Sequence, residues 1–351
     1  FIIGLIADRY FNAEKILGVL HLAGAGLMYL MYSSNDAGAF FPYALGYMIL
    51  YMPTLALVNS VSFRQMKNPE KEFSPIRAFG TIGWIAAGLL ISYLFHWDSA
   101  ENIGKGMLKN TFLLSGIAAA VLGVMSFTLP ATPPAKKDGE KVSIGQIIGL
   151  DALKLLKDKN FAVFFVASIL ICIPLAFYYQ IANPFLAGIG MKNPTGIMTI
   201  GQISEVLFLL ALPVFFTKFG FKKTILVGML AWALRYVLFA FGDAGSMSFM
   251  LIIGIALHGI CYDFFFVSGQ LYTNARAGEK YKSSAQGLIT LATYGVGMLI
   301  GFKVAGWISD MYTTSTGVNF KMIWLIPAAI AAAVLLFFSI AFSDKQKITK
   351  D

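Results

Sequence analysis

The sequence is short of charge. Of its 351 residues, only 13% are Asp, Glu, Lys or Arg, whereas 58% are hydrophobic and the mean hydropathy is +0.72. A soluble domain of this length carries about 25% charged residues, because water stabilises them at the surface. This shortage excludes an ordinary soluble globular protein and indicates a chain whose main solvent is lipid.

Reactive and metal-binding side chains are equally scarce. The chain has three His and two Cys, and Cys172 and Cys261 both lie inside apolar runs, where cysteine acts as a small hydrophobic residue. These residues supply neither a nucleophile with its base nor a metal cluster. The sequence also lacks the G-x-x-x-x-G-K-[ST] loop that cradles ATP phosphates. We therefore expect no enzyme, no metal and no cofactor, and we expect an ion or solute gradient to supply the energy.

The net charge of +9 does not indicate a nucleic-acid partner. Such a partner requires basic residues gathered on one solvated face with aromatic residues between them. Here the Lys and Arg residues stand in loops between apolar runs. We expect the lipid bilayer, and no nucleic acid, to be the large partner.

Ten apolar runs are long enough to cross a membrane, which takes about 20 residues at about 1.5 Å each. The sequence therefore predicts an all-α integral membrane protein. The predicted spans are 15–32, 38–62, 77–96, 108–128, 161–187, 195–217, 222–242, 246–271, 283–308 and 319–342.

The placement of Lys and Arg predicts the orientation. Alternate loops hold 21 of the 27 basic residues, and cytoplasmic loops carry that excess in membrane proteins. The 131–159 loop and the C-terminus are therefore expected in the cytoplasm. The prediction is a multi-pass protein of the plasma membrane, the inner membrane of a bacterium.

The polar segment 131–159 divides the chain into unequal halves. Four spans precede it and six follow it, and the apolar stub 1–6 has the character of the tail of a helix. If the halves are built alike, the first one and a half helices are absent from this chain. The predicted domains are an N-terminal bundle (1–130), a cytoplasmic loop (131–159) and a C-terminal bundle (160–351).

A loop pattern recurs in the two halves. Gly4-Leu5-Ile6-Ala7-Asp8-Arg9 leads into the first full span, and a similar loop at 216–226 follows 209 residues later. The first copy resembles the G-x-x-x-D-R motif of the major facilitator superfamily. That resemblance implies two six-helix bundles related by a pseudo-two-fold axis, with Asp8 and Arg9 as a conformational latch. The residues that follow, Phe11 to Ala13, depart from the usual glycine and basic residues.

Four polar segments resemble the nucleoside:proton symporter family within that superfamily. They are Pro75-Ile76-Arg77-Ala78-Phe79-Gly80-Thr81-Ile82-Gly83-Trp84, Phe177-Tyr178-Tyr179-Gln180-Ile181-Ala182-Asn183, Gly201-Gln202-Ile203-Ser204-Glu205 and Tyr262-Asp263-Phe264-Phe265. The resemblance implies a secondary active transporter that imports nucleosides, such as uridine, by proton symport through alternating access. We expect it to function as a monomer. The alternative is a proton-coupled symporter of the same fold for sugars, oligosaccharides or other polar solutes, which the same side chains would serve.

Arg77, Thr81 and Trp84 share one helix face, because they are spaced i, i+4 and i+7. The resemblance implies that this face lines the substrate cavity, although Trp84 stands where the family usually has Phe. A guanidinium and a hydroxyl offer hydrogen bonds, and an indole can stack on a base. The alternative is an interfacial anchor at Arg77 and a lipid-facing Trp84.

Two amide-bearing pairs lie at i, i+3 spacing on consecutive spans. Gln180 and Asn183 form the first pair, and Gln202 lies one turn before Glu205 on the next span. Carboxamides both donate and accept, which suits a nucleobase edge or ribose hydroxyls. The alternative is that they join helices by amide hydrogen bonds.

Glu205 lies about ten residues into its span, or about 15 Å deep, near the middle of the bilayer. Burial disfavours the charged form of a carboxyl, so such a group can take up and release a proton during transport. We expect Glu205 to couple proton and substrate, with Asp263 as the second candidate. The proton is the coupling ion.

His258, Tyr262 and Asp263 lie close together on another span. The resemblance places all three at the substrate site, although His258 stands where the family more often has Tyr. His258 is either a second titratable group or a neutral hydrogen-bond donor. Arg235 and Lys303 are the other intramembrane cations, and we place both outside the site, as charges that neutralise carboxylates or reach toward an interface.

Overall fold

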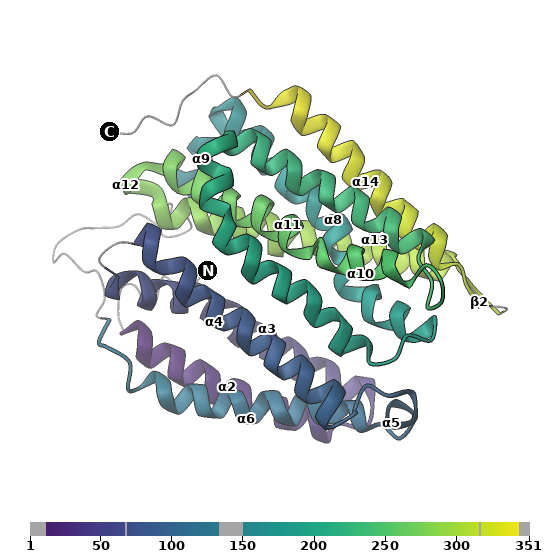
Figure 1. Cartoon of the computed structure of the whole chain (residues 1–351). Coiled ribbons are helices and arrows are strands. Elements are labelled where there is room, and N and C mark those ends of the chain that lie inside the picture. Colours follow the sequence, from purple (N-terminus) through teal and green to yellow (C-terminus); the bar gives the residue numbers. More distant parts are fainter. Residues whose placement is uncertain (1–11, 67–68, 133–149, 316, 344–351) are drawn as a thin grey trace. The chain divides into compact units, whose positions relative to one another are not determined.

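The structure, a computed structural model, is helical almost throughout (Figure 1) and describes residues 12–66, 69–132, 150–315 and 317–343. The α-helices are α2 (Ala13–Ser33), α3 (Ala37–Gln65), α4 (Pro69–Leu89), α5 (Ala100–Gly104), α6 (Asn110–Ser126), α8 (Lys159–Gly188), α9 (Pro194–Phe241), α10 (Ser248–Ala256), α11 (His258–Tyr262), α12 (Ser268–Thr290), α13 (Met298–Met311) and α14 (Phe320–Ala341). The short elements are the 3₁₀ helices η2 (Met107–Lys109) and η3 (Leu150–Lys157), the π-helical turns η1 (Leu90–Leu94), η4 (Asp263–Val267) and η5 (Leu291–Gly297), and the strands β1 (Thr313–Thr314) and β2 (Gly317–Val318).

The predicted spans correspond closely to these helices. In the part of the chain that the structure describes, nine helices are long and apolar enough to cross a membrane. Helix α3 covers the predicted span 38–62 but is not among the nine. The predicted spans 195–217 and 222–242 correspond to two helical segments of α9, Pro194–Phe216 and Lys218–Phe241, and between the two predicted spans the chain kinks at Gly220, whose backbone is not helical and has a φ of 75°. Glycine adopts this left-handed conformation without the steric cost of a Cβ.

The chain divides into two compact units. The first comprises Phe1–Arg77 and His96–Ile148, and the second comprises Ala78–Phe95 and Gly149–Asp351. The units differ from the predicted bundles in the placement of residues 78–95. In the second unit this segment contacts the start of α9, where Ser92 Oγ accepts a 2.8 Å hydrogen bond from the backbone N–H of Gly196.

The first unit packs α2 against both α3 and α6. Leu17 of α2 is fully buried there, and close to it the carboxylate of Glu14 accepts a 2.9 Å hydrogen bond from the backbone N–H of Thr132. The residues of the predicted latch, Asp8 and Arg9, lie outside the described part of the chain.

The second unit has a large aromatic core centred on α8. Phe164, Phe177 and Phe185 of α8 are at most 2% exposed, and Trp324 of α14 packs edge-on against Phe185 at 5.5 Å between ring centroids. The carboxylate of Asp158 caps the N-terminus of α8 by accepting from the backbone N–H of Phe161 at 2.9 Å. This core fixes α8, α9 and α14 beside one another and gives the polar residues on them a rigid frame.

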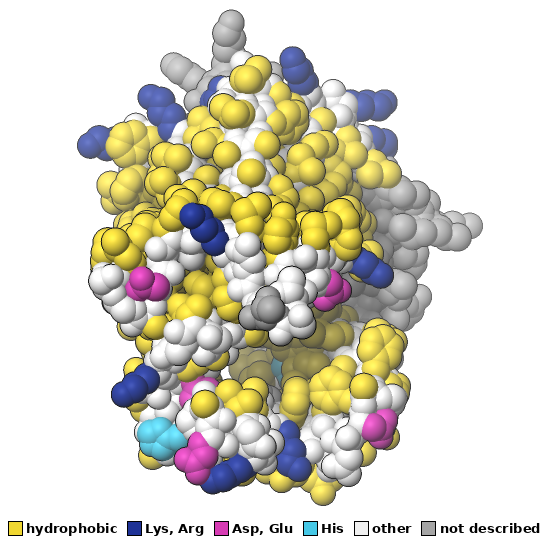
Figure 2. Space-filling model, turned by 90° about the vertical axis from the view of Figure 1, so that its right-hand side faces the viewer, with side chains coloured by type: hydrophobic (Ala, Val, Ile, Leu, Met, Phe, Trp, Pro, Cys, Tyr) yellow, Lys and Arg dark blue, Asp and Glu magenta, His cyan; other side chains and the backbone are white. Residues whose placement is uncertain are grey.

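Large apolar side chains are also abundant on the outside of the helices. Val214, Leu299 and Ile340 are 64%, 64% and 84% exposed, and Figure 2 shows hydrophobic side chains over much of one face with charged residues scattered among them. Such a surface is compatible with lipid, because each helix makes the hydrogen bonds of its own backbone N–H and C=O groups. The protein is a multi-pass membrane protein.

Candidate functional site

Glu205 lies at the centre of a polar cluster in the second unit. Its Oε1 accepts a 3.2 Å hydrogen bond from the hydroxyl of Thr81, and its Oε2 lies 3.6 Å from Nε2 of His258. The side chains of His258 and Glu205 are only 4% and 14% exposed. Thus α4, α9 and α11 each bring one predicted site residue to the same place.

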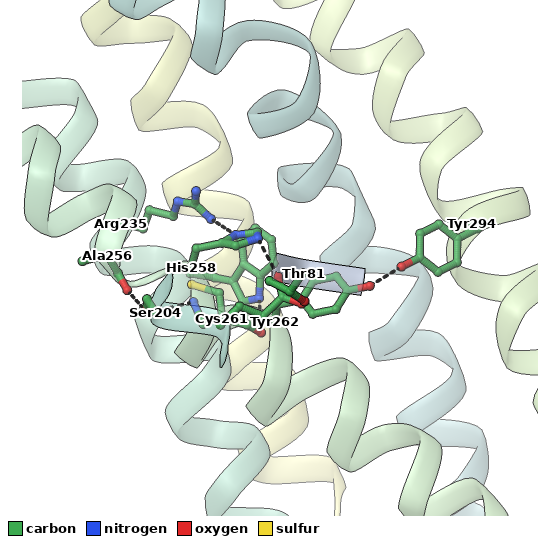
Figure 3. Close-up of polar contacts among 11 residues, drawn as sticks. Thr81, Ser204, Arg235, Ala256, His258, Cys261, Tyr262 and Tyr294 are labelled. Carbon is green, nitrogen blue, oxygen red and sulfur yellow. Dashed lines mark hydrogen bonds and ion pairs between the residues drawn. The ribbon is translucent and has the colours of Figure 1, made fainter. Parts of the chain in front are cut away.

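Close helix packing makes this meeting geometrically feasible. A Cβ on Gly259 would lie 2.4 Å from the carbonyl oxygen of Ser204, so only glycine lets α11 approach α9 this closely. The hydroxyl of Ser204 donates to the carbonyl of Ala256 and accepts from the backbone N–H of Gly259 at 3.3 Å (Figure 3). Glu205 directly follows Ser204, and His258 directly precedes Gly259. These contacts therefore hold Glu205 and His258 close to each other.

Arg235 joins the cluster from the second half of α9. Its Nη1 lies 3.0 Å from Nδ1 of His258, and the side chain is fully buried (Figure 3). Its Cζ lies 3.5 Å from the centroid of the Tyr178 ring, which stacks in turn on the imidazole at 5.4 Å. Arg235 was expected outside the site, whereas the structure places it next to His258. An arginine inside a predicted membrane span was the signal that the sequence offered, since such a charge requires compensation.

The first predicted amide pair lies on α8. Asn183 Nδ2 donates a 3.0 Å hydrogen bond to Thr195 Oγ1 at the start of α9, and it also lies 3.7 Å from Met198 Sδ. Gln180, one turn earlier, is exposed and lies near Gly306 of α13. The structure therefore gives Asn183 a contact between helices and leaves Gln180 accessible.

Gln202 differs from the first pair in its burial. It is 8% exposed, and its Oε1 has no hydrogen-bond partner among the described residues. An unpaired buried amide oxygen is costly in an apolar environment, typically by about 1 to 3 kcal/mol. Gln202 is thus an acceptor that a polar ligand or a water molecule could satisfy.

Tyr262 and Asp263 stand at the junction of α11 and the π-helical turn η4. The hydroxyl of Tyr262 shares a 2.6 Å hydrogen bond with that of Tyr294 in η5 (Figure 3), and Asp263 is 1% exposed. Insertions of π-helical turns into α-helices are frequent at functional sites. The sequence pattern gave no sign of these turns.

The other predicted residues lie farther along α4. Trp84 is 56% exposed, so its indole face is accessible. Arg77 is half-buried and belongs to the first unit, one residue before the boundary, so its place in the substrate site stays a prediction. Lys303 is exposed on α13.

Comparison with known proteins identifies the family. The model of the family described as "Nucleoside H+ symporter" matches residues 1–347. The chain is 42% identical to the YegT protein of Escherichia coli over 98% of its own length and 82% of YegT, and 32% identical to the xanthosine permease of the same organism over 99% and 85%.

Solved structures agree with the sequence comparison. The crystal structure of the nucleoside transporter NupG matches with a TM-score of 0.79 at 29% identity, covering 98% of this chain and 86% of that one. A peptide transporter, POT, matches with a TM-score of 0.65 at 13% identity, which shows the shared major facilitator fold alone. The predicted all-α membrane fold and the predicted family are confirmed: this chain is a transporter with the major facilitator fold and belongs to the nucleoside H⁺ symporter family.

Proposed function

We propose that this protein imports nucleosides such as uridine across the bacterial inner membrane together with protons, by alternating access and as a monomer with a cytoplasmic C-terminus. The observation that carries the proposal is the placement of Glu205. A carboxyl group in the interior of an apolar helix, in contact with a hydroxyl and an imidazole, is suited to exchange a proton during a transport cycle.

The substrate is held by the polar groups around that carboxyl. Gln180, Asn183 and Gln202 supply amides for the edges of the base and the ribose hydroxyls, and Tyr262 adds a phenol. Trp84 stacks on the base, while Arg77 and Thr81 supply further donors. The accessibility of Gln180 and Trp84 and the buried acceptor on Gln202 support these roles.

Proton coupling is assigned to Glu205, with Asp263 as the second carboxyl. In this scheme Glu205 is protonated when substrate enters and loses its proton to the cytoplasm, after which the empty carrier returns. Two carboxyls within the membrane spans of one carrier can titrate as a coupled pair. For this reason the two residues must be tested together.

Uptake by purified protein in sealed liposomes tests the proposal. With an inward proton gradient, labelled uridine should accumulate above its external concentration, and a protonophore should abolish that accumulation. Unlabelled xanthosine and sucrose serve as competitors, because the curated relatives include a xanthosine permease and, at 22% identity, a sucrose permease. Labelled sucrose is supplied in a parallel assay, and accumulation of sucrose with no uptake of uridine or xanthosine would replace this proposal by the sugar-symporter alternative.

A further inference from the structure

We propose that Arg235 is a positioning residue for proton coupling. It fixes His258 in the tautomer that carries its proton on Nε2 and so presents a neutral N–H group to Glu205. The proposal rests on Glu205 being the coupling carboxyl, as proposed above, but it concerns a different residue. It also explains why a fully buried arginine lies in a helix that must cross the membrane.

The tautomer follows from the chemistry of the two partners. A guanidinium has five N–H donors and no acceptor, so its contact with His258 requires a lone pair on Nδ1 of the imidazole. With the 3.0 Å contact at Nδ1, the single proton of the neutral ring must be on Nε2. That nitrogen is the one that lies 3.6 Å from Glu205 Oε2. Arg235 therefore determines which side of the ring is the donor.

The guanidinium of Arg235 lies among aromatic rings, and its Nη1 is within hydrogen-bond distance of His258 Nδ1. The guanidinium lies over the ring of Tyr178, with Trp232 and Phe239 at 5.8 and 5.5 Å from their ring centroids. Within the described part of the chain, its Nε and Nη2 have no hydrogen-bond partner. A buried cation in an aromatic enclosure needs a compensating negative charge. The imidazole connects it to the carboxylate of Glu205.

The connection gives the ionised form of Glu205 a specific stabilisation. The sequence of groups runs from cation through neutral ring to anion, and the proton on His258 Nε2 stays on His258 throughout. The separation of 3.6 Å is longer than the usual 2.7 to 3.2 Å of such a hydrogen bond. A small movement of either side chain therefore makes or breaks the contact. The proton that is exchanged is that of Glu205 itself.

Nitrogen NMR of the imidazoles tests the tautomer directly. The full chain is labelled with ¹⁵N-histidine and reconstituted in lipid without substrate. Only three histidines are present, and His21→Asn and His96→Asn variants assign their signals. The expected result for His258 is a protonated Nε2 and an unprotonated, hydrogen-bonded Nδ1. A His258 that carries its proton on Nδ1, or on both nitrogens, would overturn the proposal.

Two substitutions then test the part played by Arg235. Arg235→Met removes the donor while keeping much of the apolar stem, and it should convert His258 to the other tautomer or to a mixture. Arg235→Lys keeps a charged donor and should restore the Nε2–H form. An unchanged tautomer in folded Arg235→Met would also overturn the proposal. If the Met variant does not fold, the tautomer in the unaltered protein and in Arg235→Lys decides.

Transport by the same variants shows whether the tautomer matters for coupling. Arg235→Met should lose accumulation of uridine, down to the level seen with protonophore, while exchange of labelled for unlabelled uridine continues. Arg235→Lys should regain accumulation. Full accumulation by Arg235→Met with an altered tautomer would refute the coupling role. Absence of uptake in every protein, the unaltered one included, would instead refute the proposed function and leave the tautomer result standing.

Discussion

The hydroxyl of Thr81 donates a 3.2 Å hydrogen bond to Glu205 Oε1, although the two residues are 124 positions apart in the chain. Thr81 is 8% exposed, and it lies on α4, in the short segment that groups with the second compact unit. The contact therefore ties that segment to the carboxyl to which we assign coupling. An acceptor that is charged gains more from such a bond than a neutral one.

Replacing Thr81 by Val should weaken proton coupling, because valine keeps the shape but loses the donor. The ionised form of Glu205 should lose about 1 to 3 kcal/mol of stabilisation. We expect proton-driven accumulation of uridine to fall while uridine exchange persists. Thr111→Val is the matched control, since Thr111 is a threonine near the start of α6 whose hydroxyl bonds only to the local carbonyl of Leu108 among the described residues. Equal accumulation by both variants would contradict the role of Thr81.

The amides on α8 should contribute to substrate affinity. Gln180→Ala or Asn183→Ala is expected to weaken uridine binding by about 1 to 3 kcal/mol, because polar edges of the nucleoside lose their partners. Calorimetry on folded protein measures this change, with the exposed Gln65→Ala as control. Because Asn183 also bonds to Thr195, thermal unfolding of its variant must be measured as well. Unchanged affinity in both variants would remove these residues from the site.

The close approach of α11 to α9 should be intolerant of any side chain at position 259. Gly259→Ala places a Cβ 2.4 Å from the carbonyl oxygen of Ser204, so the helices must separate. Overpacking of this kind costs about 1 to 3 kcal/mol, and the separation should also move His258 away from Glu205. Gly26→Ala is the control, because a Cβ there meets nothing within 4 Å. The midpoint temperature of thermal unfolding in detergent should fall for Gly259→Ala only. Equal midpoints for the two variants would show that the contact is not tight.

The sequence predicted much of the fold, because the length of an apolar run and the solvent it requires are local properties. It also predicted that Gln202 and Glu205 share a face, because i, i+3 spacing determines that. It could not predict which face of one helix meets which face of another. The pairing of Arg235 with His258 depends on how the second half of α9 packs against α11, so Arg235 was missed.

Local departures from α-helical geometry could not be predicted from the hydropathy pattern. Hydropathy gives the same signal for an α-helical and a π-helical turn, so η4 and η5 were not predicted. Yet η4 begins directly after Tyr262, and η5 contains Tyr294, the hydrogen-bond partner of Tyr262. The break between the predicted spans 195–217 and 222–242, by contrast, is confirmed, because α9 is kinked at Gly220, where the backbone is not helical.

The role of Glu205 is the central claim of this account, and its comparison with Asp263 requires two variants. Glu205→Gln keeps the shape of the side chain but cannot release a proton. Asp263→Asn does the same for the second carboxyl. Glu101→Gln is a control, since Glu101 is an exposed carboxyl whose ion-pair partner is Lys105. Each protein is reconstituted in liposomes and supplied with labelled uridine.

The most direct measurement is the ratio of internal to external uridine at steady state under an inward proton gradient, beside the rate of uridine exchange without a gradient. For Glu205→Gln we predict continued exchange with a ratio near one, independent of pH and of protonophore, while Glu101→Gln accumulates uridine normally. A Glu205→Gln protein that still concentrates uridine, with the pH dependence and protonophore sensitivity of the unaltered protein, would contradict the account and transfer the coupling role to Asp263.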